Sequence, residues 1–537
     1  MVMNYDALES RYPSRRGLVY GKKGMVCTSQ PQAAQAGLDI LKKGGNAVDA
    51  ALAAAACLTV VEPCSNGIGG DCFALVWKDG RLYGLNGSGP SPALLKADRL
   101  WQAGLTEIPE KGWIPVTVPG VPAAWACLNE RFGALSLRED LQPAVDCAGE
   151  GFPVTPVIAH AWRQAGRAMM PLRGKEEFQE WFRVFTDDGR TPEAGELWRL
   201  PDHARTLEAI GESRAEEFYR GSLADAMEAF SLRTGGLLRK GDLLSYAPQW
   251  VEPVSVTYKG YDIWELPPNG NGVVVLAALN ILEQLKIKGH EDPEGIHRQL
   301  EAMKLAFADG QQFLADPRRM RLPVDALLNK SYAKERAGQI RERAMLPEHG
   351  TPYCGGTVYL CTADESGMMV SFIQSGYDDF GSGIVVPGTG INLQDRGCGF
   401  SLDPESPNFL EPGKRPYHTI IPGFLGKDGA ALGPFGVMGA MMQPQGHVQV
   451  LMNLIDFGMN PQDALNAPRW QWKGERKVEL EAGFGPEVLC SLRKRGHEVS
   501  TAGNPWSMGR GQMILRQKNG VYVGATEPRA DGCALPW

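Results

Sequence analysis

The sequence lacks long apolar segments and a strong charge of either sign. No run of eighteen apolar residues occurs among its 537 residues, so it offers no candidate for a membrane-spanning helix. The N-terminus lacks the apolar core of a secretory signal peptide, and we therefore expect a cytoplasmic protein. A formal net charge of -7 gives no electrostatic reason to expect nucleic acid or an anionic membrane as a partner.

Several common catalytic motifs are also missing. We find no Gly-x-Ser-x-Gly nucleophile elbow, no phosphate-binding P-loop, no dinucleotide-binding glycine motif, and no pair of His or Cys at zinc-ligand spacing. The 11 cysteines are odd in number and irregularly spaced, which favours reduced thiols in the core over a disulfide framework or a metal site. We therefore expect neither a metal nor another cofactor.

The composition is that of one large globular unit, with 43% hydrophobic and 22% charged residues and no internal repeat or low-complexity linker. Apolar spacing predicts a helix over 31–43, and Asn46 can cap a second helix that runs to about Val60. The second helix is nearly all alanine, valine and leucine, so we expect it to be buried. A third, amphipathic helix is predicted to end before Pro317, and the charged stretch 334–352 is interpreted as a solvated helix.

The most informative segment is Gly355-Gly356-Thr357, followed by a run rich in β-branched and aromatic residues up to Asp364. This run predicts a strand buried on both faces. Two glycines can hold the peptide bond before Thr357 in strain, and the threonine hydroxyl can then attack the Gly356 carbonyl. Cleavage would free a Thr357 α-amine that serves as the base for its own hydroxyl. A glycine turn that leads into an ordinary core strand is the alternative interpretation.

Other motifs support the catalytic interpretation, because together they resemble γ-glutamyltransferases in family order from about Gly21 to about Gly532. The motifs are 29–63, Asn66-Gly-Ile-Gly-Gly-Asp71-Cys-Phe73, Val116-Thr-Val-Pro-Gly120, Leu266-Pro-Pro-Asn269, Glu301-Ala-Met-Lys-Leu-Ala-Phe-Ala-Asp309, Phe380-Gly-Ser-Gly-Ile-Val-Val-Pro-Gly388, Asn466-Ala-Pro-Arg469 and Pro528-Arg529. The resemblance implies an α+β fold, a four-layer αββα sandwich of the N-terminal-nucleophile hydrolase type. It also implies cleavage into fragments 1–356 and 357–537 that stay associated as one catalytic unit, with a higher oligomer possible.

The resemblance assigns the chemical steps to four residues. Thr357 aligns with the family nucleophile, and Ser375 stands where the family has a second threonine whose hydroxyl contacts it. Gly439 and Ala440 match the paired glycines whose backbone amides form the oxyanion hole. Alanine keeps the amide, provided that its backbone φ is negative.

The residues that would hold a free amino-acid head depart from the family pattern. Ser88 replaces the arginine for the α-carboxylate, and Gly399 replaces the aspartate for the α-ammonium group. Tyr377 replaces an asparagine and Arg396 a glutamine. His418-Thr419 replace a pair of serines. Arg396 is a candidate for a new carboxylate site, because a guanidinium can bind a carboxylate bidentately; a structural role is the alternative.

Three functions remain open at this point. The first is cleavage or transfer of the acyl group of γ-glutamyl amides, with a small-molecule amide and water or an amine acceptor as partners. The second is an amidohydrolase or acylase for another carboxylate-bearing acyl group, of the oxamate or glutaryl type. The third is an unprocessed protein without catalytic activity, which the presence of nucleophile, Ser375 and oxyanion loop makes the weakest of the three.

Overall fold

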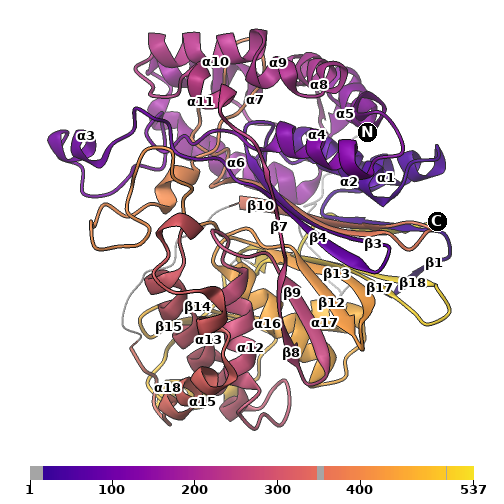
Figure 1. The fold of residues 1–537 in the computed structure, drawn as a ribbon, viewed down its shortest axis with the longest axis vertical. Helices are drawn as coiled ribbons and strands as arrows, with labels where there is room; N and C mark the ends of the chain where they lie inside the picture. Colours follow the sequence, from indigo (N-terminus) through magenta and orange to yellow (C-terminus); the bar gives the residue numbers. More distant parts are fainter. Residues whose placement is uncertain (1–15, 347–355, 504) are drawn as a thin grey trace, which may run out of the picture.

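Two facing seven-stranded sheets form the centre of the computed structural model, which describes residues 16–346, 356–503 and 505–537 (Figure 1). The first sheet has the order β19 (Cys533–Pro536), β2 (Met25–Thr28), β10 (Gly356–Ala363), β11 (Met369–Tyr377), β3 (Asp71–Lys78), β4 (Arg81–Gly87) and β7 (Gln249–Val251). The second has the order β1 (Val19–Gly21), β18 (Tyr522–Thr526), β17 (Arg510–Arg516), β13 (Ala430–Met438), β12 (Gly423–Lys427), β9 (Tyr261–Glu265) and β8 (Val254–Tyr258). Neighbouring strands within both sheets are antiparallel.

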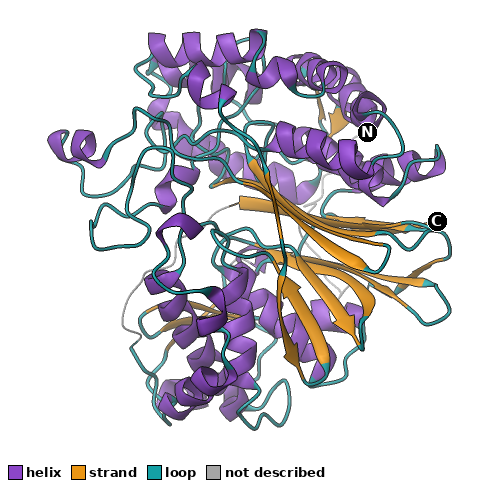
Figure 2. Ribbon diagram, viewed as in Figure 1, coloured by secondary structure: helices purple, strands orange, loops and turns teal. Residues whose placement is uncertain are grey.

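Helices cover the outer face of each sheet, as Figure 2 shows. The layer on the first sheet contains α1 (Pro31–Lys42), α2 (Ala47–Val61), α3 (Ala97–Gln102), α4 (Val121–Phe132), α5 (Leu137–Glu150), α6 (Pro156–Met169), α7 (Gln179–Phe185), α8 (Pro201–Ser213), α9 (Glu216–Tyr219), α10 (Ser222–Arg233) and α11 (Lys240–Leu244). The layer on the second contains α12 (Gly272–Leu282), α13 (Pro293–Phe313), α14 (Val324–Leu327), α15 (Lys330–Gln339), α16 (Met442–Ile455), α17 (Pro461–Asn466) and α18 (Pro486–Lys494). The predicted α+β fold with four αββα layers is thus confirmed. Two small sheets pack among the helices: β5 (Phe152–Pro153) with β6 (Leu197–Trp198) in the first layer, and β14 (Trp470–Gly474) with β15 (Lys477–Leu480) and β16 (Glu498–Thr501) in the second.

Strand β10 is buried on both faces, as its sequence predicted. Val358 and Leu360 pack into the core beneath the helices of the first layer. Tyr359 and Cys361 point the other way, into the apolar layer between the two sheets. The alternation of side chains along a strand produces this division. This alternation also fixes the face of the sheet on which each side chain near the start of β10 lies.

Helix α2 supports β10 from the outer layer, and all its residues are buried. The Asn46 side chain accepts hydrogen bonds from the backbone of Val48 and Asp49, and the Asp49 carboxylate accepts one from the Asn46 amide in return. This reciprocal cap confirms the predicted start of the helix. The Thr362 hydroxyl of β10 donates to the Ala47 carbonyl, which joins the first turn of α2 to the strand.

The predictions for the charged stretch and the cysteines need correction. Helix α15 ends at Gln339, and Arg336 is not solvated because its side chain forms an ion pair with Asp309 and is 16% exposed. Residues 347–355, the rest of that stretch and Gly355, lie outside the described residues. The ten cysteines in the described part are free thiols, but half are only partly buried or, at Cys490, exposed. Within the same part of the chain, no helix combines the length and apolarity needed to cross a membrane.

Strands from before and after Thr357 are hydrogen-bonded neighbours in both sheets. In the first sheet, β10 pairs with β2 on one side and with β11 on the other, and β11 then pairs with β3. In the second, β12 lies between β9 and β13. Strand pairing therefore joins the two parts of the chain along several edges.

The N-terminal cap of α2 yields a test of this packing. We expect Asn46→Ala to lower the free energy of unfolding by about 1–2 kcal/mol, because backbone amides of a buried helix lose their acceptor. Thermal and urea unfolding measure the change. Asn46→Ser, which keeps a capping oxygen, is the matched control, and equal stability of Asn46→Ala and wild type would contradict the role of the cap.

Candidate active site

Thr357 lies at the start of β10 with its hydroxyl in a buried polar cluster. Its Oγ1 is 3.2 Å from Ser375 Oγ, and the Gln443 side-chain amide donates to it at 3.4 Å. The side chain is 1% exposed. The register between β10 and β11 shifts between Gly356 and Val358, and such an irregularity redirects a side chain at the end of a strand. No sequence motif pointed to Gln443, which reaches the cluster from α16.

Ser375 connects the Thr357 hydroxyl to a positive charge. Its Oγ accepts a hydrogen bond from the Tyr377 backbone amide at 2.8 Å and another from Arg396 Nη2 at 3.1 Å. The Arg396 guanidinium and the Thr357 oxygen are thus separated by one hydroxyl group. Ser375 therefore lies where the alignment with a second family hydroxyl predicted it.

Arg396 is fully buried, so it is not a surface arginine. Its Nη1 donates to the Thr419 hydroxyl at 2.8 Å, and its guanidinium stacks 4.3 Å from the centre of the Tyr377 ring. Burial lowers the pKa of the guanidinium, while Tyr377, Asp71 and Asp395 act in the opposite direction. Among the described residues no carboxylate lies within ion-pair distance of Arg396, and its Nε atom has no hydrogen-bond partner.

Tyr377 holds its ring over Arg396 from a strained backbone conformation. It has φ of 84°, in the left-handed region that a bulky aromatic residue rarely adopts. Such strain costs about 1–3 kcal/mol and persists only where surrounding contacts fix the residue. The hydrogen bond to Ser375 and the contact with Arg396 supply such contacts.

The loop between β13 and α16 contains the two predicted oxyanion residues, but not in the expected conformation. Gly439 has φ of 133° and Ala440 has φ of 48°, so the condition of a negative φ at Ala440 is not met. A left-handed alanine costs roughly 1–2 kcal/mol. Within residues 16–346, 356–503 and 505–537, neither backbone amide has a hydrogen-bond acceptor, which leaves both able to donate to an oxyanion.

A cavity of about 580 Å³ opens beside this cluster. Three predicted substrate residues, Tyr377, Gly399 and Thr419, line it. Met441, which follows the predicted oxyanion residues in the loop between β13 and α16, lines it as well. Its other lining residues combine apolar side chains with carboxylates, namely Ile108, Pro109, Leu314, Phe400 and Tyr417 together with Glu107, Glu110 and Asp378. The cavity therefore provides an apolar chamber with acidic groups next to the buried guanidinium.

The predicted substrate residues Ser88, His418 and Arg396 are not among the residues that line the cavity; Arg396 lies behind Tyr377 and Thr419, which its side chain contacts. The Ser88 hydroxyl donates to Asn86 Oδ1 at 2.7 Å and is completely buried. His418 Nε2 lies 3.1 Å from Asp71 Oδ2, and both side chains are also completely buried. At Gly399, a Cβ atom would come within 2.9 Å of the Tyr417 carbonyl oxygen, so a larger residue there needs a shift of the backbone.

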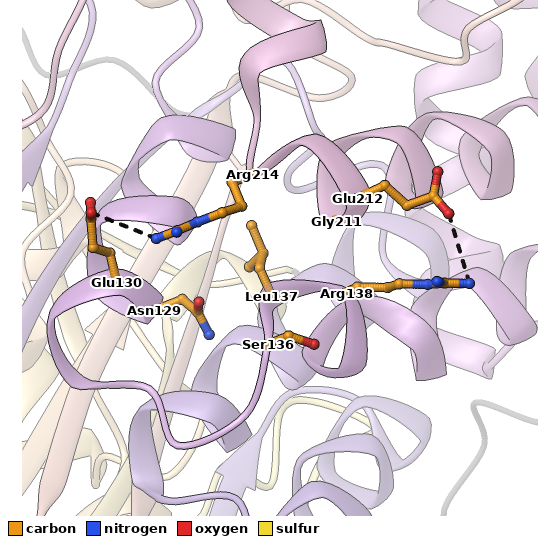
Figure 3. A pocket seen from close by; sticks show the side chains of 8 residues that line it. All are labelled: Asn129, Glu130, Ser136, Leu137, Arg138, Gly211, Glu212 and Arg214. Carbon is orange, nitrogen blue, oxygen red and sulfur yellow. Dashed lines mark ion pairs between the residues drawn. The ribbon is translucent and has the colours of Figure 1, made fainter.

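Two further features lie apart from this cluster. A surface pocket of about 600 Å³ between α4, α5 and α8 is bordered by the ion pairs Glu130–Arg214 and Arg138–Glu212 (Figure 3), and none of the predicted site residues lines it. His297, Glu301 and His497 bring three potential ligand atoms within 4.8 Å of one another, a grouping that sequence spacing did not reveal.

Most polar atoms of the His297 group have hydrogen-bond partners, although the buried His497 Nδ1 has none among the described residues. His297 Nδ1 lies 2.9 Å from His497 Nε2, and its Nε2 lies 2.8 Å from the Arg341 carbonyl oxygen. The Lys304 ammonium group donates to Glu301 at 2.8 Å, and this positive charge disfavours a metal ion on the same carboxylate. The arrangement indicates a structural polar network.

Comparison with known proteins agrees with the fold. Residues 33–537 match the gamma-glutamyltranspeptidase family, and the chain belongs to that family. It is therefore an enzyme of the class whose members are made as hydrolase proenzymes.

The individual relatives carry different activities in their names. The chain is 53% identical to a cephalosporin acylase from Bacillus halodurans, whose crystal structure superposes with a TM-score of 0.97 over 100% of this chain and 99% of the other. It is 36% identical to the glutathione hydrolase-like YwrD proenzyme of Bacillus subtilis, covering 96% of this chain and 99% of the relative. The oxamate amidohydrolase proenzyme of Klebsiella pneumoniae is 34% identical, with 95% and 98% covered.

Ser375 offers a direct test of the cluster. We expect Ser375→Ala to lower kcat by about tenfold to a hundredfold, because removal of this hydroxyl separates the nucleophile from its polar neighbours. Rates of amide hydrolysis by fully cleaved protein measure the effect. Ser375→Thr, which keeps the hydroxyl, is the control. An unchanged kcat in Ser375→Ala would limit Ser375 to packing.

Proposed function

We propose that the chain is a self-processing amide hydrolase or acyltransferase whose nucleophile is Thr357. In maturation, Thr357 Oγ1 attacks the Gly356 carbonyl carbon, the peptide C–N bond breaks, and an ester forms. Water then hydrolyses the ester, which leaves a carboxylate on Gly356 and a free α-amine on Thr357. The burial of Thr357 between the Ser375 and Gln443 side chains supports this assignment.

The same groups serve each catalytic cycle. The Thr357 hydroxyl attacks the substrate amide carbonyl and passes its proton to its own α-amine. The backbone amides of Gly439 and Ala440 stabilise the oxyanion, and the amine product leaves with the proton. Water or an amine acceptor then removes the acyl group from Thr357.

We infer that the acyl group of the substrate carries a carboxylate, and one observation carries this inference. Arg396 is a buried guanidinium without a carboxylate in ion-pair contact among the described residues, and a buried charge of this kind is costly unless it is paired. Tyr377 and Thr419, which both contact the guanidinium, line the cavity. A substrate carboxylate that enters between them would complete the pairing of Arg396.

The acyl group that fits best is one without an α-ammonium group, of the glutaryl or oxamate type. The residue that would pair with the ammonium group is Gly399, and the one that would bind the α-carboxylate, Ser88, is already hydrogen-bonded to Asn86. The named activities of the acylase and the oxamate amidohydrolase relatives support this choice. The γ-glutamyl group remains a second candidate, because Asp378 lines the cavity and its carboxylate could receive an ammonium group.

The two fragments should remain together after cleavage. Strand β10 would begin at the new N-terminus, and it is hydrogen-bonded between β2 of the large fragment and β11 of the small one. Separation of the fragments would expose the edges of β2 and β10 that now pair with each other, and the apolar layer between the sheets.

Maturation gives the first test of this proposal. We expect the purified protein to run as two bands with the small fragment starting at Thr357, and Thr357→Ala to remain a single intact chain. N-terminal sequencing identifies the cleavage site. A small fragment with any other first residue would refute Thr357 as the nucleophile, and persistent full-length wild type would favour the non-catalytic alternative.

The substrate assignment is tested through Arg396. We expect Arg396→Met to reduce kcat/KM for a glutaryl anilide by roughly 10- to 150-fold, the loss of a charged hydrogen bond worth about 1.5–3 kcal/mol. Hydrolysis of an acyl anilide that lacks the carboxylate should fall less, because it loses only the effect of the guanidinium on Ser375 and Thr357, and it provides the control. Equal losses on both substrates would show a structural role for Arg396.

A comparison of donors separates the two acyl candidates. Wild-type enzyme should prefer a γ-glutamyl anilide over the glutaryl anilide by less than about a hundredfold, or roughly 2.7 kcal/mol. A larger preference that is lost in Asp378→Asn would establish the γ-glutamyl alternative.

A further inference from the structure

A second buried carboxylate lies beside the Arg396 site. Asp71 begins β3 directly opposite Ser375 on β11, so their side chains share one face of the sheet about 5 Å apart at Cβ. Ser375 Oγ in turn accepts from Arg396. Ser375 is therefore the neighbour that Thr357, the Arg396 guanidinium and Asp71 have in common.

Asp71 is held by neutral donors only. Its Oδ1 accepts from the Gln394 side-chain amide at 2.9 Å and from the Gly89 backbone amide at 3.1 Å. Its Oδ2 faces His418 Nε2 at 3.1 Å. The other imidazole nitrogen, Nδ1, accepts from the Ile420 amide at 3.4 Å, which places the single proton of a neutral His418 on Nε2, toward Asp71.

The electrostatic surroundings of Asp71 contain few charges. The groups that face it or act on it are Gln394, Arg396, Arg415, His418, Tyr219, Tyr246 and Cys72. Burial keeps the tyrosine and cysteine groups neutral by raising the pKa of each, and it lowers the pKa of His418 well below its ordinary value. Only Arg396 and Arg415 remain as positive charges.

We propose that Asp71 and His418 are specificity-determining residues that together take up one proton from solvent when Arg396 binds a substrate carboxylate. In the empty site, the ionised form of Asp71 is one of two carboxylates, with Asp395, that act on Arg396 from beyond ion-pair distance. A substrate carboxylate adds a further buried anion, and anions near one guanidinium repel each other. One added proton on the Asp71–His418 pair removes that repulsion. This inference rests on the proposed function.

The pH dependence follows from the direction of this coupling. Burial raises the pKa of Asp71 to about 7, although hydrogen bonds and Arg396 act to lower it. The bound carboxylate raises it further, so protons are taken up at pH values above about 7 and below the bound-state pKa. Because linkage is reciprocal, carboxylate binding is constant below that range and weakens as pH rises through it, by up to about tenfold per pH unit.

Glutarate binding to the fully cleaved wild-type protein tests the proposal without turnover. Calorimetric titration at pH 7.5, in buffers with different ionisation enthalpies, measures the protons taken up per glutarate bound. We expect wild type to take up about half a proton more per glutarate than Asp71→Asn at pH 7.5, and about the same number at pH 6; the Thr357 α-amine, which both proteins carry, contributes equally to each. The glutarate Kd of Asp71→Asn should change less with pH than that of wild type between 6 and about 8.5, over which glutarate stays ionised.

Asp395 provides the matched comparison, because it is equally buried, acts on Arg396, and burial raises its pKa to about 7 as well. Asp395→Asn should retain the proton uptake. Loss of uptake in Asp395→Asn with retention in Asp71→Asn would overturn the proposal, as would wild-type uptake that is absent or independent of pH. If Asp71→Asn fails to fold, the absence of uptake in wild type would still overturn the proposal, as would its loss in Asp395→Asn.

The outcomes also separate this inference from the function on which it rests. Glutarate binding that is lost in Arg396→Met but proceeds without proton uptake would leave the carboxylate site standing and refute the role of Asp71 and His418. Failure of glutarate to bind would overturn both.

Discussion

The Ser375 hydroxyl lies between the Thr357 oxygen and the Arg396 guanidinium, and the site depends on these two short contacts. The nucleophile must lose a proton to react, and a nearby positive charge favours the anionic form of any group beside it. In the proposed function, the same charge also binds the carboxylate of the substrate. One buried cation would then serve both orientation and chemistry, which would account for a guanidinium in a place without solvent.

The cost of burying Arg396 is distributed over the surrounding fold. The hydroxyls of Ser375 and Thr419 and the ring of Tyr377 each satisfy part of the guanidinium. Tyr377 does so from a left-handed backbone, and Ala440 adopts a similar conformation in the loop across the cluster. Such strain can persist because β10 and β11 are central strands, paired on both sides and covered by α2.

The departures from the family pattern make physical sense as a group. Gly399 carries no charge for an ammonium group, and Ser88 is engaged in its own hydrogen bonds. In their place the chain has Arg396, with Asp71 and His418 forming a neutral or singly charged pair beside it. A site with one cation suits an acyl group with one carboxylate, whereas a zwitterionic head needs a matched pair of charges.

Local periodicity and capping residues predicted the burial of β10 and the cap of α2, and the family resemblance carried by an ordered set of motifs implied the four layers and pointed to Thr357. The sequence could not determine that Ser88 turns away from the cavity, that Ala440 is left-handed, or that Gln443 reaches Thr357. Those facts depend on contacts between residues far apart in the chain. The pairing of Asp71 with His418 is of the same kind, because only the antiparallel order of β10, β11 and β3, and the loop that returns to them, brings the two side chains together.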